Sequence, residues 1–434
     1  MALLKIPYET AEEMGVSLEL EVPDRNLQIQ CIPQEPGPIR DVADAVEEAT
    51  ESPVQGQKFS ELVHGGKKVT FIAENQFRAA PARDILPGLV EKARLAGCDI
   101  SIIIGNATLP PLSSGQIEMK LGRELVQNGI PIVCNEISKP EQYRYVGITR
   151  SGTPLFIHEV VVDSDIIVTV STTQATVWGY GGSGMIIPAV VAKETTEINH
   201  LMSMAPDCVP GNNDCLMQLD KYEALEMAKV NMGINVIVSN QNHVIFVNAG
   251  SPVESHKAAV EHYNGIYWFS IPGLNRNKAD IALTGSTAPT NHLFLHSSWA
   301  AANCDPVVRD GGIIILATPC PGYGDWPGFG RMDLLKPHLP ASIEKQDGAI
   351  KDFYEQVVGK KKNRSFTWYK IYEVMVRKEV WVVTGKANIP FCREIGLPAY
   401  ESIEEAFGEA MKKCGKNATV AFVPYGRYTV VRPS

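Results

Sequence analysis

One stretch constrains the fold of this 434-residue chain more than any other: an apolar run that leads into a glycine-rich segment. The apolar run, VVVDSDIIVTV, begins at Val160, and residues 179–184 read Gly-Tyr-Gly-Gly-Ser-Gly. A buried strand, a glycine-rich turn and then a helix, predicted here at 188–193, is how α/β proteins expose backbone N–H groups to an anionic ligand. The segment lacks the Lys-Ser/Thr ending of a phosphate loop, so a flexible turn is the alternative.

From residue 65 onward, strands alternate with helices. The predicted strands 69–73, 101–104 and 130–134 are apolar throughout, and helices are predicted between them at 82–96 and 115–128. Such runs favour an α/β fold with mostly parallel sheets covered on both faces. Ligands bind beyond the carboxyl ends of the strands in such sheets.

A second α/β run begins with the predicted strand at 279–285. We therefore predict two domains, residues 1–275 and 276–434, with the last strand a candidate to return to the first domain. The remaining predicted elements are a β-hairpin of strands 17–22 and 27–32, helices at 41–51, 222–232 and 293–303, strands at 235–240, 311–319 and 380–385, and a glycine- and proline-rich loop up to residue 330.

Composition limits the class of protein. The chain has 40 basic and 49 acidic side chains, a formal net charge of −9, which argues against a nucleic-acid partner. No apolar run is long enough to span a membrane, and no secretory leader pattern is present, so we expect a cytoplasmic protein. The nine cysteines include no CxxC pair, which favours reduced thiols.

A few residues stand out as candidates for chemistry. Arg78 follows the strand at 69–73, where a guanidinium can hold a carboxylate in bidentate geometry, although a surface arginine is the simpler interpretation. His292 and His296 are four residues apart in a predicted helix and could share a metal ion, but isolated core or surface histidines are more common. His200, taken alone, is more often a structural residue than a ligand.

Several motifs, in order along the chain, resemble the lactate racemase family. They are PDRNL (23–27), SELVHGGKKV (60–69), Arg78 with Pro81, LGRELVQNGIPIVCNE (121–136), the glycine-rich segment, INH (198–200), ADIALTG (279–285) and GGIIILATPCPGYG (311–324). The resemblance implies two α/β domains with an active site in the cleft between them. It also implies a nickel-pincer nucleotide cofactor that accepts a hydride from a 2-hydroxy acid.

The resemblance assigns roles to individual residues. Arg78 matches the arginine that holds the substrate carboxylate, and His200 matches the nickel-binding histidine. The glycine-rich segment corresponds to the cofactor loop, so the expected cofactor-binding residues are Gly179, Gly181, Gly182, Ser183 and Gly184.

Other positions depart from the family pattern. Leu109 and Pro110 stand where the family has a histidine and an arginine, and Gln174 replaces the second catalytic histidine. Gly184 occupies the position of the lysine that tethers the cofactor, so the nucleotide would be held non-covalently. His296 and Trp299 replace a glutamine and a lysine on the substrate side. Losing a general base typically removes about two to four powers of ten in rate, so lactate racemisation by two histidines is not expected.

We therefore expect a divergent isomerase that racemises or epimerises a 2-hydroxy carboxylic acid other than lactate. Its expected catalytic residues are His296, Gln174 and Glu74, with Arg78 and Trp299 binding the substrate. The alternatives are a lyase or other enzyme that uses a different divalent metal bound by histidines, and a non-catalytic carboxylate-binding protein. The expected partners are a small carboxylate substrate and cofactor-synthesis proteins, with a homo-oligomer possible and no nucleic acid or membrane.

Overall fold

The computed structural model describes residues 1–10, 12–321, 336–355 and 367–434. The chain forms two compact units. The central unit comprises Glu35–Gln174 and Trp178–Tyr263, and the terminal unit comprises Met1–Gln34, Ala175–Val177 and Asn264–Ser434. Most of the predicted loop up to residue 330 lies outside the described residues.

This division differs from the predicted boundary at 275/276. The first 34 residues belong with the C-terminal part of the chain, because β3 (Leu27–Gln30) joins the terminal unit's sheet as a parallel neighbour of β19 (Val420–Val423). The last strand, β20 (Val430–Pro433), pairs with β14 (Trp268–Ile271), which is also in the terminal unit. Neither long-range pairing has a signal in the local sequence.

The central unit is built on a six-stranded sheet in the order β13-β12-β9-β4-β5-β6. Its strands are parallel except for the antiparallel edge pair β12 and β13. Their bounds are β4 (Lys68–Glu74), β5 (Asp99–Gly105), β6 (Ile132–Cys134), β9 (Ile166–Thr172), β12 (Met232–Val238) and β13 (Val244–Gly250). The predicted parallel α/β architecture is confirmed.

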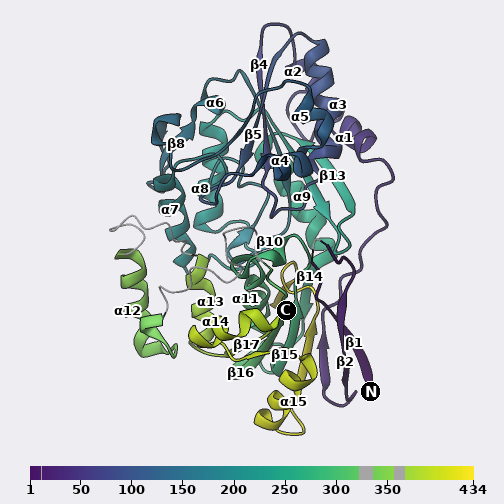
Figure 1. Ribbon diagram of the computed structural model, residues 1–434, viewed down its shortest axis with the longest axis vertical. Coiled ribbons are helices and arrows are strands. Elements are labelled where there is room, and N and C mark those ends of the chain that lie inside the picture. The colour runs from purple at the N-terminus through teal and green to yellow at the C-terminus, as the bar shows by residue number, and fades with distance from the viewer. Residues whose placement is uncertain (11, 322–335, 356–366) are drawn as a thin grey trace. The chain divides into compact units, whose positions relative to one another are not determined.

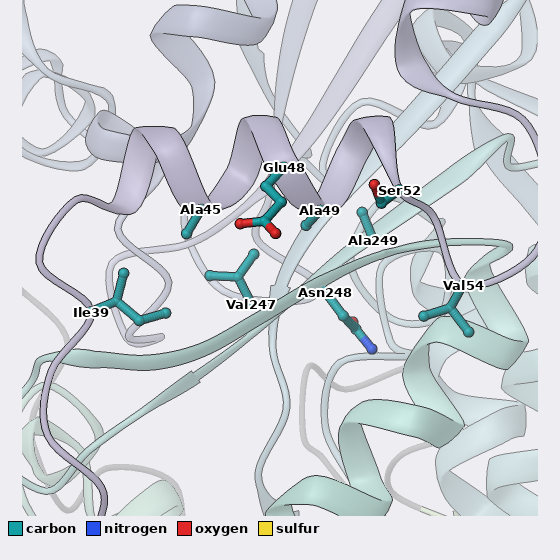
Figure 2. Close-up of a pocket in the computed structure, with 9 residues that line it drawn as sticks. All are labelled: Ile39, Ala45, Glu48, Ala49, Ser52, Val54, Val247, Asn248 and Ala249. Atoms are coloured by element: carbon teal, nitrogen blue, oxygen red, sulfur yellow. The ribbon is translucent and has the colours of Figure 1, made fainter.

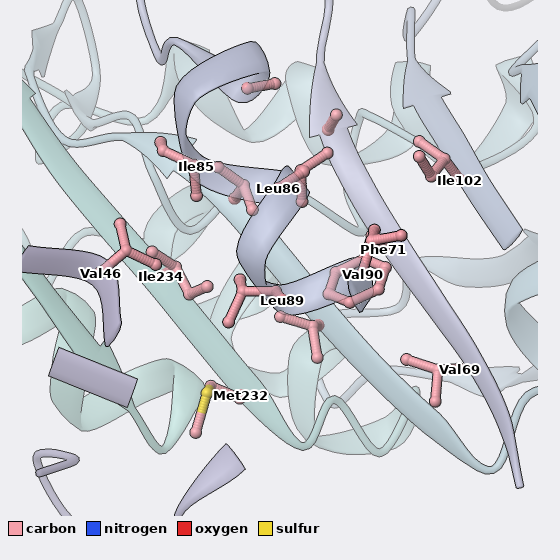
Figure 3. Packing of buried hydrophobic residues seen from close by; sticks show 14 of the residues in the cluster. Val46, Val69, Phe71, Ile85, Leu86, Leu89, Val90, Ile102, Met232 and Ile234 are labelled. Carbon is pink, nitrogen blue, oxygen red and sulfur yellow. The ribbon is translucent and has the colours of Figure 1, made fainter. Parts of the chain in front are cut away.

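Helices cover both faces of this sheet (Figure 1). On one face, Ile85, Leu86 and Leu89 of α3 pack against Phe71 of β4 and Ile234 of β12 (Figure 3). On the other face, Ile72, Ile103 and Ile167 share a core with residues of α8. The helices of this unit are α1 (Val42–Glu51), α2 (Phe59–Leu62), α3 (Ala82–Leu95), α4 (Ser114–Leu121), α5 (Arg123–Gln127), α6 (Glu159–Val162), α7 (Lys193–Leu201), α8 (Leu216–Met227) and α9 (Pro252–Tyr267).

Two helix predictions in the central unit need correction. The helix predicted at 115–128 is two helices, because Gly122 has a φ of +83° and ends α4. No helix spans 188–193, and the next helix, α7, begins at Lys193. Ala189, Val190, Val191 and Ala192 are all buried, and because four successive residues point to every side of a helix, a helix with one buried face would not account for this burial.

A third helix differs from its prediction in position. The helix predicted at 222–232 is α8, which begins earlier, at Leu216, and ends at Met227. The central unit also contains the antiparallel pair β7 (Tyr143–Ile148) and β8 (Pro154–His158) and the short strand β11 (Gly179–Tyr180).

The terminal unit contains a second six-stranded sheet, all parallel, in the order β18-β17-β16-β15-β19-β3. Its other strands are β15 (Ala279–Gly285), β16 (Val308–Ala317), β17 (Glu379–Val383) and β18 (Ala399–Tyr400), and the short strand β10 (Ala175–Thr176) lies outside this sheet. The helices are α10 (Phe294–Ser297), α11 (Trp299–Cys304), α12 (Ile343–Tyr354), α13 (Thr367–Met375), α14 (Ile389–Glu394) and α15 (Ile403–Cys414).

The N-terminal hairpin prediction is wrong in its pairing. β2 (Ser17–Val22) is present, but its antiparallel partner is β1 (Ala2–Pro7) and not β3. In Figure 1 the purple β1 and β2 lie beside the strands of the terminal unit. Alternating apolar residues identified the strands, whereas the partner was chosen by burial of Leu4, Ile6 and Leu20 in this unit's core. Across the described residues, none of the helices has the length and apolar character of a membrane span.

Candidate functional site

The loop after β4 holds two of the predicted site residues. Glu74, the last residue of the strand, accepts hydrogen bonds from the Thr172 N–H and hydroxyl, both at 2.8 Å, and from the Ala80 N–H at 3.4 Å. Arg78 is half-buried in the loop. The Glu74 carboxylate thus ties the end of β9 to this loop, and its role in proton transfer stays a prediction.

A lysine from α4 supports the same loop. The Lys120 ammonium donates to the main-chain oxygens of Arg78, at 2.9 Å, and of Ala80, at 2.7 Å. Burial lowers the pKa of Lys120 to about 8. The Glu74 charge acts to raise this pKa, and the Arg78 charge acts to lower it. Lys120 therefore fixes the backbone that carries the Arg78 guanidinium.

The glycine-rich segment is buried and held on two sides. From α9, His256 Nε2 lies 2.7 Å from the Gly181 carbonyl oxygen, and its Nδ1 lies 2.8 Å from the Tyr222 hydroxyl. From α8, the Gln218 amide donates to the Ser183 hydroxyl at 2.6 Å. These hydrogen bonds join the segment to α8 and α9 of the central unit.

Two glycines in this segment are required by close contacts. Gly179 has a φ of +141°, and a Cβ there would be 2.7 Å from the Asn212 carbonyl oxygen. Gly182 has a φ of +106°, and its Cβ would be 2.7 Å from the His256 ring. Gln174, whose carbonyl accepts from the Gly181 N–H at 2.8 Å, is buried beside them. Cofactor binding by these glycines stays a prediction.

His200 is buried on α7 with a defined tautomer. Its Nδ1 lies 2.9 Å from the Thr196 carbonyl oxygen, which can only accept, so Nδ1 carries the proton and Nε2 carries the lone pair. Burial, together with the charge of Lys221, lowers the pKa of His200 to about 3. A neutral imidazole oriented through its second nitrogen is the form that binds a metal ion.

Lys221 of α8 lies among these residues. Its Nζ is 5.6 Å from the ring centroid of Trp178, the residue before Gly179. The Lys221 charge lowers the pKa of His200 and of His256, and the Arg78 charge lowers the pKa of Lys221 itself. Trp178 therefore links Lys221 to the glycine-rich segment and to His200, whose ring centroid lies 5.4 Å from that of Trp178.

Asp220, the neighbour of Lys221, accepts hydrogen bonds from several elements around the site. Its carboxylate accepts from the Thr149 hydroxyl, from the Thr153 hydroxyl at 2.7 Å and from the Asn199 amide at 2.7 Å. These partners join the β7–β8 pair and α7 to α8. Asn199 precedes His200, so the carboxylate helps to fix the position of that histidine.

Glu197 precedes His200 by three residues on α7, and residues three apart lie on neighbouring positions of a helix surface. Its side chain is only 4% exposed, and within the described residues neither carboxylate oxygen has a hydrogen-bond partner. Burial raises the pKa of Glu197 to about 8, with Lys193 acting in the opposite direction. The carboxyl group is therefore protonated near neutral pH and can donate a proton beside His200.

We expect Glu197→Gln to change how stability depends on pH. The folded pKa is raised above the unfolded value of 4.5, so wild-type stability falls as pH rises from 4.5 to about 8. The two proteins should have similar free energies of unfolding at pH 4.5, and at pH 8 the variant should be more stable by roughly 4 kcal/mol. Urea unfolding across this range measures the difference, with Glu194→Gln, an exposed carboxyl on the same helix, as the control. Parallel wild-type and Glu197→Gln curves would contradict the prediction.

The remaining predicted site residues, His296 and Trp299, belong to the terminal unit. Their rings are in an edge-to-face contact with centroids 5.6 Å apart. The guanidinium carbon of Arg427, a fully buried residue, lies 4.2 Å from the Trp299 ring centroid, and Arg427 donates to the Ala175 carbonyl oxygen at 2.9 Å. Trp299 is thus a buried aromatic residue in contact with two polar neighbours, His296 and Arg427.

The predicted metal pair of His292 and His296 does not have helical spacing. Leu293 between them is extended, with φ −115° and ψ 135°, so the helix predicted at 293–303 begins only at Phe294 and is divided at Ser298. Burial lowers the pKa of His292 to about 4. In the part of the chain that the structure describes, no three His, Cys, Asp or Glu side chains are grouped as metal ligands.

A separate pocket of about 320 Å³ lies between α1 and β13 (Figure 2). Figure 2 shows Glu48 pointing from α1 toward Val247, with mostly apolar side chains around it. The amide of Asn248 is already bonded to the Ser255 carbonyl oxygen at 2.8 Å. This pocket contains none of the predicted site residues and has few polar groups to orient a ligand.

Sequence reasoning missed Lys120, Glu197, Asp220, Lys221 and His256. The sequence LMQLDKYEALEM contains one signal, because its Asp-Lys pair stands in a segment with apolar residues on every side. Such a pair in a helix without a clear polar face indicates buried charges.

Comparison with known proteins places this geometry in context. Residues 15–209 match the family model described as the lactate racemase N-terminal domain. The chain is similar in structure to the lactate racemase apoprotein from Thermoanaerobacterium thermosaccharolyticum, with a TM-score of 0.83 and 21% identity over 99% of this chain and 100% of that one.

It is also similar to a protein from Thermotoga maritima known from a crystal structure, with a TM-score of 0.68 and 14% identity over 92% of this chain and 100% of that one. No curated protein matches the chain. At these identities the structural likeness establishes the fold. The family match identifies residues 15–209 as a lactate racemase N-terminal domain.

Proposed function

We propose that this protein is a lactate racemase-like isomerase, which racemises or epimerises a 2-hydroxy carboxylic acid other than lactate with a nickel-pincer nucleotide as cofactor. The observation that carries the proposal is His200, whose Nδ1 is fixed on the Thr196 carbonyl oxygen so that Nε2 carries the lone pair. The residues present fit a metal held by this one protein ligand and by donor atoms of the nucleotide, without a tether at Gly184. When bound, the nickel nucleotide supplies a hydride acceptor.

The chain's own residues would bind and orient the acid. The Arg78 guanidinium would hold the substrate carboxylate, on a backbone fixed by Lys120. Gln174 can orient a hydroxyl group but cannot exchange a proton near neutral pH, so His296 and Glu74 remain the proposed proton carriers. Glu197, protonated near neutral pH, is a further proton donor on the helix of His200.

We expect His200→Ala to reduce nickel retention at least tenfold, because it removes the one oriented metal ligand that the proposal assigns to the chain. The protein would be purified anaerobically with nickel and co-expressed cofactor-synthesis proteins, then analysed for metal and for a released pyridinium mononucleotide by mass spectrometry. His243→Ala, a change at an exposed histidine, is the control.

Activity would be followed by chiral chromatography of 2-hydroxy acids deuterated at C2. Hydride transfer returns the deuterium to C2, whereas proton abstraction exchanges it with solvent. A wild-type protein with neither nickel nor nucleotide would contradict the proposal. The remaining interpretation would then be a non-catalytic carboxylate-binding protein. A different metal without nucleotide would favour the metal-dependent lyase.

A further inference from the structure

A buried ammonium group without an anionic partner lies at the centre of the site. The Lys221 side chain is 3% exposed, and within the described residues it makes no hydrogen bond and no ion pair. Its contact with the Trp178 ring, 5.6 Å away, stabilises a cation by about 0.5–2 kcal/mol. The free-energy cost of burying an uncompensated charge is larger than the stabilisation from this ring contact. A bound anion would compensate the charge of Lys221.

The groups around Lys221 form no ion pair with it within the described residues, although the charge of Asp220 raises its pKa. The nearest carboxylate in sequence, Asp220, is occupied by three hydrogen-bond donors. The thiols of Cys208 and Cys215 are hydrogen-bonded to each other, and Cys215 Sγ also donates to the Trp178 carbonyl oxygen at 2.9 Å. Burial lowers the pKa of Lys221 to about 8, with the Arg78 charge acting in the same direction and the charges of Cys215, Cys208 and Asp220 opposing it, so the amine is mostly protonated at pH 7.

Two positive charges lie on elements held at the carboxyl end of β9: the Arg78 loop is bonded to Thr172 through Glu74, and Lys221 lies over Trp178, six residues further along the chain. A guanidinium holds one carboxylate through two parallel hydrogen bonds, and this leaves the ammonium for a second anionic group. We propose that Lys221 is a specificity-determining residue that binds the second carboxylate of a dianionic 2-hydroxy acid, while Arg78 binds the first. The substrate class is then a 2-hydroxy dicarboxylate, an inference that rests on the proposed function.

The test is equilibrium binding to the full chain by calorimetry, on the same preparations that are analysed for nickel. The probes are both enantiomers of 2-hydroxysuccinate and of 2-hydroxybutanoate, which have four carbons each but two and one carboxylates, together with inorganic phosphate. We expect wild type to bind 2-hydroxysuccinate at least tenfold more tightly than 2-hydroxybutanoate. Lys221→Met should abolish this preference and leave 2-hydroxybutanoate binding unchanged.

Lys257→Met is the matched control, because Lys257 also lies over an aromatic ring, 5.8 Å from Tyr222, but is exposed and paired with Glu254. It should keep the preference. Thermal melting reports folding, and Lys221→Met should melt at the wild-type temperature or above, since an apolar side chain replaces a buried charge.

Several results would overturn the inference: no binding of either acid, equal binding of both, a preference that survives Lys221→Met, or a preference for phosphate over both acids. Each of these can occur in protein that contains nickel, and would then leave the racemase proposal standing. Conversely, a preference that depends on Lys221 in protein without nickel would support the dianion site and count against the racemase.

Discussion

Asp220→Ala is expected to lower the free energy of unfolding by about 3–5 kcal/mol, because it leaves buried hydrogen-bond donors without an acceptor. The side chain is 0% exposed and accepts from Thr149, Thr153 and Asn199. Each orphaned donor costs about 1–3 kcal/mol when water cannot replace the carboxylate. Urea unfolding followed by circular dichroism measures the change.

Two other substitutions make the Asp220 prediction specific. Asp214→Ala removes an exposed carboxylate from the loop before α8 and should change the free energy of unfolding by less than about 0.5 kcal/mol. Asp220→Asn keeps one acceptor oxygen and should give an intermediate loss. A loss below about 1 kcal/mol for Asp220→Ala would show that the carboxylate does not join the β7–β8 pair and α7 to α8 as described.

Gly182→Ala is expected to destabilise the central unit by about 2–4 kcal/mol, from two causes that add. The φ of +106° disfavours any residue with a Cβ. The new methyl group would also lie 2.7 Å from His256 Cδ2 and 3.0 Å from the Thr173 hydroxyl, where overpacking costs about 1–3 kcal/mol. The His256 ring cannot move freely, since both its nitrogens have partners in Gly181 and Tyr222.

The neighbouring glycine provides the control for this prediction. At Gly181 a Cβ would meet its closest atom, the Thr172 carbonyl oxygen, at 3.5 Å, which is ordinary van der Waals contact. Gly181→Ala should therefore cost less than about 1 kcal/mol by urea unfolding. Equal losses for the two variants would mean that the segment is loosely held, and the glycine-rich loop would have to be treated as a flexible turn.

The candidate site was only partly accessible from the sequence. The motifs led to Arg78, His200 and the glycine-rich segment, and the structure places His200 and that segment beside Trp178, over which Lys221 lies. Lys221 was missed, because a lysine in a helix is ordinarily a solvated residue and the lack of a clear polar face in α8 is a weak local signal. His256 was missed for a similar reason, because its hydrogen-bond partner Gly181 lies 75 positions earlier in the chain and no local pattern links the two.

The sequence by itself determined the elements and the class of fold. Apolar runs such as 69–73 and 279–285 are strands of parallel sheets, as predicted, because a strand buried on both faces needs apolar residues at successive positions. The break of the helix at Gly122 and the early start of α8 changed element bounds without changing the architecture.

Only the tertiary structure decided which elements became neighbours. β3 left the predicted hairpin to pair with β19, and the helical spacing expected of His292 and His296 was lost at an extended, fully buried Leu293. The tertiary structure also buried Asp220, Lys221 and Glu197. The physical reason is that burial and strand pairing depend on residues far apart in the chain, whereas periodicity and turn chemistry act over a few residues.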